Sequence, residues 1–340
     1  MSGSGREARG DRVRAALDET GLDAVVLRRA ENFAWYSGGA DNRVDHASTA
    51  GVADIVVTRA GEYVVTNNIE APRIREEQVP GWDVVEYEWY AGPGDLVRKL
   101  AGGAAIGADA PDPTETEVDV AGLIAPLRYG LDADAIERYR AVGADAMAAV
   151  DAACAALTPA MTETEAAGAV TAACRAAGLF TPALMVGGEA RIPRHRHPIP
   201  AGAPLGARVM VVVCAERGGL YANLTRFVHF EPPDDELAAK LEACQEILAR
   251  LRDATRPGRT LGDVFGDCVA FYADAGFADG WRHHHQGGLT GYRSRELIAA
   301  PGAAHEITTG QAFAWNPSVP GAKAEETFVL TENGPEVLCS

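Results

Sequence analysis

Residues 281–292, WRHHHQGGLTGY, place three consecutive histidines just before a pair of glycines. Imidazole has an ordinary pKa close to neutrality, so it can move protons or bind a metal near pH 7. Glycine lets the backbone approach a ligand closely. Side chains on a regular strand alternate between its faces, so we expect at most two of the histidines to face the same way. The segment predicts a functional site that contains at least one of them.

The composition narrows the class of protein. The chain has 340 residues and a formal net charge of -17, which disfavours nucleic acid as a partner. No apolar run approaches the roughly 20 residues of a membrane helix, and the N-terminus lacks the apolar segment of a signal peptide. The six cysteines show no CxxC spacing, which is typical of reduced thiols. We therefore expect a cytoplasmic protein without membrane partners.

The order of expected elements predicts two domains and an α+β fold. After a disordered tail at residues 1–10, strands alternate with helices over residues 11–128, which indicates an α/β domain. A proline-rich segment then leads to a second domain at residues 132–340. Its pattern of helix pair and hairpin occurs twice, an internal duplication. Thr162, with Glu165 three residues on, predicts a capping box at one helix start.

Several motifs, in this order and spacing, resemble those of one family. They are ENFAWYSGG at residues 31–39, YANLTRF at 221–227, RPGRTLGDV at 256–264 and ETFVLTENGPEVL at 326–338. The chain resembles the pita-bread family, which contains creatinase, methionine aminopeptidase, prolidase and Xaa-Pro aminopeptidase. The resemblance covers nearly the whole chain. It implies a pita-bread catalytic domain preceded by a creatinase-type N-terminal domain.

The resemblance also places the positions that hold metal in the family's metallopeptidases. There, two metal ions are held by Asp, Asp, His, Glu and Glu. These positions fall on Val212, Asn223, His285, Asn316 and Glu325. Only the histidine and the last glutamate keep the ligand type, whereas two divalent cations need several anionic oxygens. We predict that no metal and no cofactor is bound, which puts aminopeptidase activity in doubt.

Creatinase, a metal-free member of the family, implies a different chemistry. Its proton-transferring histidine falls on His195 by spacing, although His197 would share the same face of an extended loop, so the choice stays open. Either imidazole can take a proton from water and return it to a leaving nitrogen. His285 would supply a second imidazole. Glu325 would orient it or pair with a cationic group of the substrate.

Other residues are candidates for substrate binding, each with a structural alternative. Asn223 and Asn316 can donate to an oxyanion or carboxylate, or can hydrogen-bond each other in a relic pocket. Tyr292 can donate to substrate or form an aromatic wall. Lys323 can clamp a substrate carboxylate or pair with a glutamate, and Arg226 can bind substrate or form a structural ion pair.

The functional prediction is a metal-independent, creatinase-like hydrolase of a C–N bond in a small amino-acid-derived substrate. One alternative is an aminopeptidase with a degenerate metal site that binds one metal through His285 and Glu325. The others are a biosynthetic enzyme catalysing cyclisation or elimination, and a non-catalytic binding protein. The resemblance further implies a homodimer in which residues 41–46 cap the partner's pocket.

Overall fold

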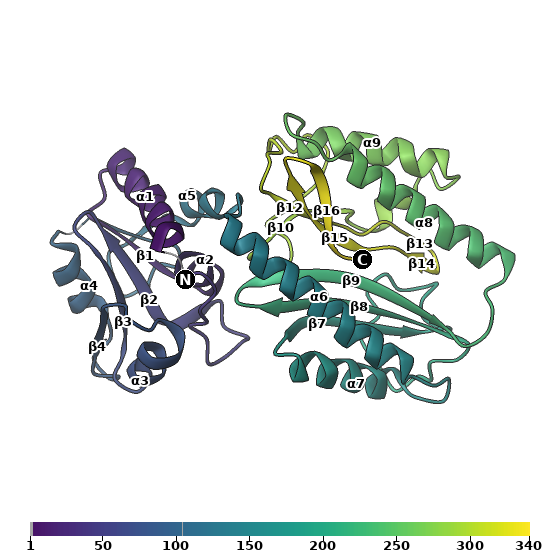
Figure 1. Cartoon of the computed structure of the whole chain (residues 1–340), viewed down its shortest axis with the longest axis horizontal. Helices are drawn as coiled ribbons and strands as arrows, with labels where there is room; N and C mark the ends of the chain where they lie inside the picture. Colours follow the sequence, from purple (N-terminus) through teal and green to yellow (C-terminus); the bar gives the residue numbers. More distant parts are fainter. Residues whose placement is uncertain (1–2, 104) are drawn as a thin grey trace. The chain divides into compact units, whose positions relative to one another are not determined.

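The computed structural model describes residues 3–103 and 105–340, which form two compact units, Met1–Tyr129 and Gly130–Ser340 (Figure 1). This division falls between residues 128 and 132, where the sequence places the domain boundary. No helix among the described residues is long and apolar enough to cross a membrane. The predicted α+β organisation is confirmed: both units combine helices with sheets.

The first unit is built on a six-stranded mixed sheet in the order β4-β3-β2-β1-β5-β6. The central strand β1 is fully buried over its first five residues, lies antiparallel to β2 and runs parallel to β5. Helices flank the sheet. The elements are α1 (Gly3–Thr20), β1 (Ala24–Arg29), α2 (Ala30–Ser37), β2 (Ala50–Thr58), β3 (Glu62–Asn67), α3 (Ala71–Arg73), the π-helical turn η1 (Ile74–Gln78), β4 (Val84–Tyr87), α4 (Gly94–Ala101), β5 (Ile106–Ala108), β6 (Val118–Asp119), α5 (Ala121–Ile124) and the 3₁₀ turn η2 (Ala125–Arg128).

The tail predicted at residues 1–10 is wrong for residues 3–10, which form the first turns of α1. Long-range contacts hold this segment: Arg9 is buried and its Nε donates to the carbonyl oxygen of Tyr36 over 3.0 Å. The Arg6 guanidinium lies 3.5 Å from the centre of the Trp82 ring, and its Nε donates to Glu62. Residues 1 and 2 lie outside the described part of the chain.

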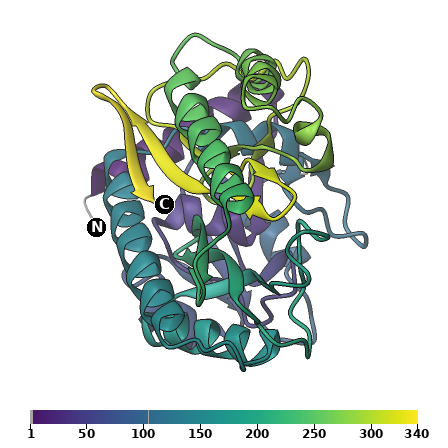
Figure 2. The ribbon, with the colours of Figure 1, turned by 90° about the vertical axis from the view of Figure 1, so that its right-hand side faces the viewer.

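The second unit contains the three-stranded sheet β7-β8-β9, the five-stranded sheet β11-β10-β12-β15-β16 and the small pair β13-β14. Helices α6 and α7 pack together against the three-stranded sheet, whereas α8 and α9 pair on the other half (Figures 1 and 2). The elements are α6 (Ala133–Ala155), α7 (Glu163–Ala176), β7 (Phe180–Gly188), β8 (Arg208–Arg217), β9 (Leu220–His229), α8 (Asp235–Ala254), α9 (Leu261–Asp274), the 3₁₀ turn η3 (Gly280–His283), β10 (Gly287–Thr290), β11 (Leu297–Ile298), β12 (Ala312–Trp315), β13 (Ser318–Val319), β14 (Ala322–Lys323), β15 (Glu326–Thr331) and β16 (Gly334–Cys339).

The helix starts in this unit carry the expected caps. The predicted capping box is present: Thr162 accepts from the Glu165 backbone, and the Glu165 side chain accepts from the Thr162 backbone. Thr260 and Asp263 repeat the arrangement at α9, which matches the duplicated pattern.

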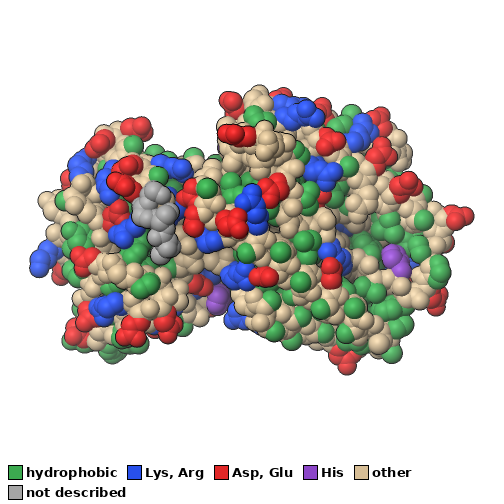
Figure 3. Space-filling model, viewed as in Figure 1, with side chains coloured by type: hydrophobic (Ala, Val, Ile, Leu, Met, Phe, Trp, Pro, Cys, Tyr) green, Lys and Arg blue, Asp and Glu red, His purple; other side chains and the backbone are tan. Residues whose placement is uncertain are grey.

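On the face shown in Figure 3, acidic side chains are interspersed with arginines and lysines.

Candidate active site

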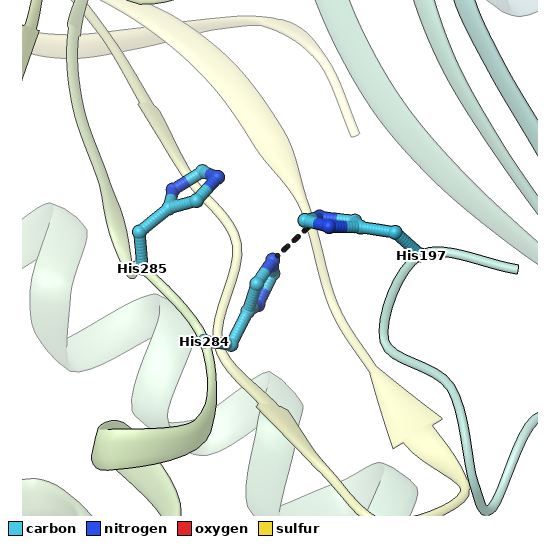
Figure 4. A group of neighbouring side chains, drawn as sticks. All are labelled: His197, His284 and His285. Carbon is cyan, nitrogen blue, oxygen red and sulfur yellow. Dashed lines mark hydrogen bonds between the residues drawn. The ribbon is translucent and has the colours of Figure 1, made fainter.

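Three imidazoles converge in the second unit. His197 comes from the loop between β7 and β8, whereas His284 and His285 precede β10; Figure 4 shows the three rings facing a common centre. The Nε2 atoms of His197 and His284 are 3.0 Å apart and share a hydrogen bond. One nitrogen from each of the three side chains can be chosen so that all lie within 4.8 Å of one another. The histidine stretch therefore contributes two of the three imidazoles of this cluster.

A buried hydrogen-bond network explains why two adjacent histidines face the same centre. Gln286 is fully buried, donates to the carbonyl oxygen of His284 and accepts from the Tyr272 hydroxyl over 2.7 Å. The Tyr272 hydroxyl also accepts from the Ser318 backbone N–H over 2.8 Å. Ser318 Oγ then lies 3.1 Å from Nδ1 of His284 and turns Nε2 of that ring toward His197. Because regular strand pairing begins only at Gly287, strict alternation does not apply here.

The loop between β7 and β8 brings His197, and not His195, to this group. Pro198 is buried, and its carbonyl oxygen accepts from the Val186 N–H of β7 over 3.1 Å, which anchors the residue next to His197. His195 is exposed at the end of a turn in which its N–H donates to the carbonyl oxygen of Arg191. The structure thus brings His197 to the other two imidazoles and leaves His195 exposed at the turn.

Glu325 lies beside the imidazoles with both carboxylate oxygens in use. Oε1 accepts from Arg295 over 3.0 Å, while Oε2 pairs with Nζ of Lys323 at 2.9 Å and accepts from Thr225 over 2.7 Å. Lys323 and Glu325 are almost completely buried. The two cations together lower the pKa of Glu325 to about 2, although its burial acts in the opposite direction. The structural alternative for Lys323, an ion pair with a glutamate, is present.

The hairpin of β8 and β9 supplies the opposite side of the site. Val212 is paired with Thr225, and Cys214 is paired with Asn223, so these four side chains share one face of the sheet. Val212 packs with apolar neighbours. Burial raises the pKa of the Cys214 thiol to about 11, so this cysteine is a poor nucleophile at neutral pH.

Both asparagines of the site are buried, and each has an acceptor without a partner. Asn223 donates through Nδ2 to the carbonyl oxygen of Tyr221 at 3.3 Å and to Thr290 at 3.4 Å. Among the described residues, no group donates to Oδ1 of Asn223 or of Asn316. The backbone N–H of Asn316 is bound to the carbonyl oxygen of Gln286, which places Asn316 next to the histidine segment. Within the described residues, Asn223 Oδ1 thus offers an acceptor, while Nδ2 is bound to Tyr221 and Thr290.

Two predicted substrate ligands are engaged elsewhere. Arg226 follows Thr225 on β9 and points to the other face, where its Nε pairs with Asp151 at 2.5 Å. Its role as a substrate ligand is therefore wrong, and the structural ion pair is correct. The Tyr292 hydroxyl is buried and accepts from Arg138 over 3.0 Å, as expected of the buried aromatic alternative.

The residues at the family's metal positions do not fit a pair of divalent cations. Val212 has no ligand atom, and the two asparagines carry no charge. The remaining carboxylate, Glu325, is already neutralised by a lysine and an arginine that would repel a metal ion at the same oxygens. His285 keeps the ligand type of the family, and within the described residues its buried Nδ1 has no hydrogen-bond partner.

The surroundings favour the neutral form of all three imidazoles. Burial, followed by the charge of Lys323, lowers the pKa of His284 to about 2. Burial, followed by the charge of Arg295, lowers the pKa of His285 to about 4. Burial also lowers the pKa of His197. Each ring therefore keeps one nitrogen lone pair that can accept a proton.

Sequence reasoning missed two members of the site, His284 and Arg295. Of the three consecutive histidines, the sequence predicts a role for His285 alone, because the family resemblance places that residue at a ligand position. Arg295 lies in a loop after β10, where no local pattern distinguishes it from its neighbour Arg293. One signal could have pointed to Arg295. Glu325 is the single carboxylate left at the family's metal positions, and without metal ions a buried carboxylate needs side-chain cations as partners.

Comparisons with known proteins agree with this architecture. The model of Metallopeptidase family M24 matches residues 137–332, and that of the Creatinase/Prolidase N-terminal domain matches residues 9–117. The probable dipeptidase PepE of Mycobacterium tuberculosis (strain ATCC 25618 / H37Rv) is 24% identical over 350 residues, 94% of this chain and 90% of that protein. The crystal structure of dipeptidase PepE from Mycobacterium ulcerans is 22% identical, with a TM-score of 0.79 and coverage of 100% of this chain and 97% of that one. The prolidase from Pyrococcus horikoshii OT3 is 17% identical with a TM-score of 0.82, and 98% of each chain is covered. The predicted pita-bread family is confirmed, and the chain belongs to metallopeptidase family M24.

Proposed function

We propose that this protein is a hydrolase of a C–N bond in a small amino-acid-derived substrate, and that it works without the family's pair of metal ions. Membership of the M24 family and similarity to a probable dipeptidase support hydrolysis of a C–N bond. Dipeptides are therefore among the first substrates to test.

The observation that carries the metal-independent part is the pairing of Glu325 with Lys323 and Arg295. In a two-metal site of the family, the carboxylate at this position would bind metal ions taken up from solution. Here two cations supplied by the chain are bound to it instead. Positive charge is thus built into the site, and hydroxide formation falls to a group other than a metal.

His197 is the base in this proposal. In the required tautomers, His284 donates from Nδ1 to Ser318 Oγ, and His197 donates from Nε2 to Nε2 of His284. Nδ1 of His197 then carries a lone pair on an exposed ring. It takes a proton from water as the water oxygen attacks the carbon, and the protonated imidazole returns that proton to the nitrogen when the C–N bond breaks.

The groups around the imidazoles divide the binding of substrate between them. Positive charge from Lys323 and Arg295 stabilises the negative charge that develops on a carbonyl oxygen during attack, or binds a carboxylate of the substrate. The unpartnered Oδ1 atoms of Asn223 and Asn316 accept from substrate N–H groups. Filling these acceptors on binding removes the free-energy cost of leaving them buried and unpaired.

The competing functions make different demands on the same residues. An aminopeptidase with a degenerate site would need Glu325 as a ligand, which its two ion pairs disfavour. A binding protein would need no proton-transferring imidazole, and a cyclising or eliminating enzyme would use the same imidazoles without water.

The test is turnover by protein freed of metals with EDTA. The panel contains dipeptides, including Xaa-Pro, together with ureido and guanidino amino acids, and the readout is the amine released. We expect turnover that Mn²⁺ and Co²⁺ do not raise. His197→Ala should lower kcat by about 10²–10⁴-fold, whereas the control His195→Ala, two residues away, should match the wild type. Turnover that appears only after Mn²⁺ or Co²⁺ is added would reject the proposal.

The predicted homodimer and the cytoplasmic location stay predictions. Light scattering of the purified chain tests the first, and fractionation of the source cells tests the second.

A further inference from the structure

The group formed by His197, His284 and His285 has the properties of a ligand set as well as those of a base. We propose that these three imidazoles bind one transition-metal ion of the zinc class, at a site distinct from the family's carboxylate positions. The part of this proposal that concerns inhibition rests on the proposed function, whereas metal binding itself does not.

The ligand nitrogens of His197 and His284 are about as close together as two ligands of one bound ion. Two nitrogen ligands of a tetrahedral zinc ion lie roughly 3.3 Å apart, given Zn–N distances of about 2.0–2.1 Å. The Nε2 atoms of His197 and His284 are 3.0 Å apart, and the three ligand atoms lie within 4.8 Å of one another. A metal ion can take the place of the hydrogen between the first two rings. The ring of His285 faces the same centre as the other two (Figure 4), and a turn of its side chain would bring a nitrogen closer to an ion held there.

The surroundings orient the rings as a metal site requires. Ser318 Oγ binds Nδ1 of His284, the kind of outer contact that fixes the tautomer of a ligating histidine. His285 has a buried Nδ1 that no described residue contacts by a hydrogen bond, so this ring can turn toward a ligand without breaking one. His197 is exposed, which gives an ion a path from solvent.

The chemistry of the ligands selects the ion. Three neutral imidazoles suit Zn²⁺, Ni²⁺ or Cu²⁺, whereas Mg²⁺ and Ca²⁺ prefer oxygen ligands. The nearby cations Lys323 and Arg295 outweigh Glu325 and weaken the binding of any cation. Removal of one of these positive charges should therefore tighten metal binding, an effect opposite in sign to the loss of a ligand.

A bound metal ion has a consequence for the proposed reaction. Coordination through Nε2 of His197 leaves the proton on Nδ1, so neither nitrogen of that ring can accept a proton from water. Zn²⁺ should therefore inhibit the hydrolase rather than activate it. Chelation by EDTA should restore the activity.

The test is isothermal titration of the full, EDTA-dialysed chain with ZnCl₂ and, in a second arm, with MgCl₂. We expect one equivalent of Zn²⁺ to bind and Mg²⁺ not to bind. His284→Ala should abolish the binding, Ser318→Ala should weaken it by about tenfold, and Lys323→Met should tighten it. His195→Ala is the matched control and should bind like the wild type.

Circular dichroism of each variant establishes that it is folded, and His284→Gln replaces His284→Ala if the latter unfolds. Co²⁺ in place of Zn²⁺ should give the visible absorption of a tetrahedral complex, a signal that does not depend on activity. The absence of saturable Zn²⁺ binding, or equal binding by the wild type and the folded His284 variant, would overturn the metal site. Activation by Zn²⁺ of a protein that binds it through these histidines would overturn the inhibition and, separately, the metal-independent function.

Discussion

Replacement of Glu325 by glutamine should destabilise the second unit strongly. The substitution keeps the size of the side chain and removes its charge, which leaves Lys323 and Arg295 without their shared anion. Both side chains are largely buried, at 3% and 12% exposure, so water compensates them poorly. Removing one partner of a buried ion pair typically costs about 3–5 kcal/mol.

The pKa of the carboxyl group gives a second route to the magnitude. It falls from 4.5 to about 2 in the folded protein. This difference corresponds to about 3 kcal/mol of stability at neutral pH. Because the folded pKa is the lower one, this stabilisation is complete above pH 4.5 and is lost as the pH falls toward 2. The gap between the wild type and Glu325→Gln should narrow accordingly.

Glu326→Gln is the matched control, since it changes the next residue in the same way. Glu326 pairs with Arg252, whose side chain is 29% exposed and remains in contact with water. Loss of the Glu326 charge should therefore lower the free energy of unfolding by no more than about 1 kcal/mol. The assay is urea unfolding followed by far-UV circular dichroism at pH 7 and pH 4. A double variant, Glu325→Gln with Lys323→Met, should recover part of the loss because one uncompensated cation is gone.

Equal losses for the two glutamine variants at pH 7 would refute this account of Glu325. So would a stability difference between wild type and Glu325→Gln that stays the same from pH 7 to pH 4. Either result would mean that the carboxylate is not the group that neutralises the buried cations.

Three further predictions concern stability and use the same unfolding assay. The pKa of His284 is lowered from 6.5 to about 2, so below pH 6.5 the unfolded chain takes up a proton that the folded chain does not. This proton uptake should lower the free energy of unfolding by about 2 kcal/mol at pH 5. The stability of His284→Asn should depend less on pH, and parallel stability profiles for this variant and the wild type would contradict the prediction. Thr162→Ala removes a capping box and should cost about 1 kcal/mol, while Thr162→Ser, which keeps the hydroxyl, should cost little; equal losses would disprove the cap. Gly287→Ala should destabilise the unit by at least about 1–3 kcal/mol, because φ is +106° and the new Cβ would meet Ala314 O at 2.0 Å. Its control, Gly168→Ala on an open helix face, should instead stabilise the unit by about 0.5–1 kcal/mol. A Gly287→Ala variant more stable than Gly168→Ala would contradict the geometry.

The fold was largely predictable because its signals are local. The capping box at Thr162 and the β8–β9 hairpin depend on residues close together in sequence, and both were predicted. The short helix α2 was not, because six of its eight residues are buried, polar Asn32 and Ser37 included, so no alternation of apolar and polar residues reveals the helical period. The start of α1 was also missed, since its order depends on contacts with residues far along the chain.

The site was predictable only where the family motifs fix positions. His285 and Glu325 were found this way. Whether His195 or His197 reaches the other imidazoles depends on the turn that begins at Arg191, and no sequence pattern predicts this turn. The role of His284 depends on Gln286, Tyr272 and Ser318, which meet only in the folded chain.

The salt bridges of Glu325 also constrain how this protein can change. Restoring aspartate at Asn223 alone would add a buried charge with no metal to balance it, since Val212 supplies no ligand. Removing Lys323 first would forfeit the charge balance of Glu325 before any metal could take over. Each of these two single steps toward a two-metal site should thus be less stable than the present arrangement. A designer who wishes to restore such a site must change both sets of residues together.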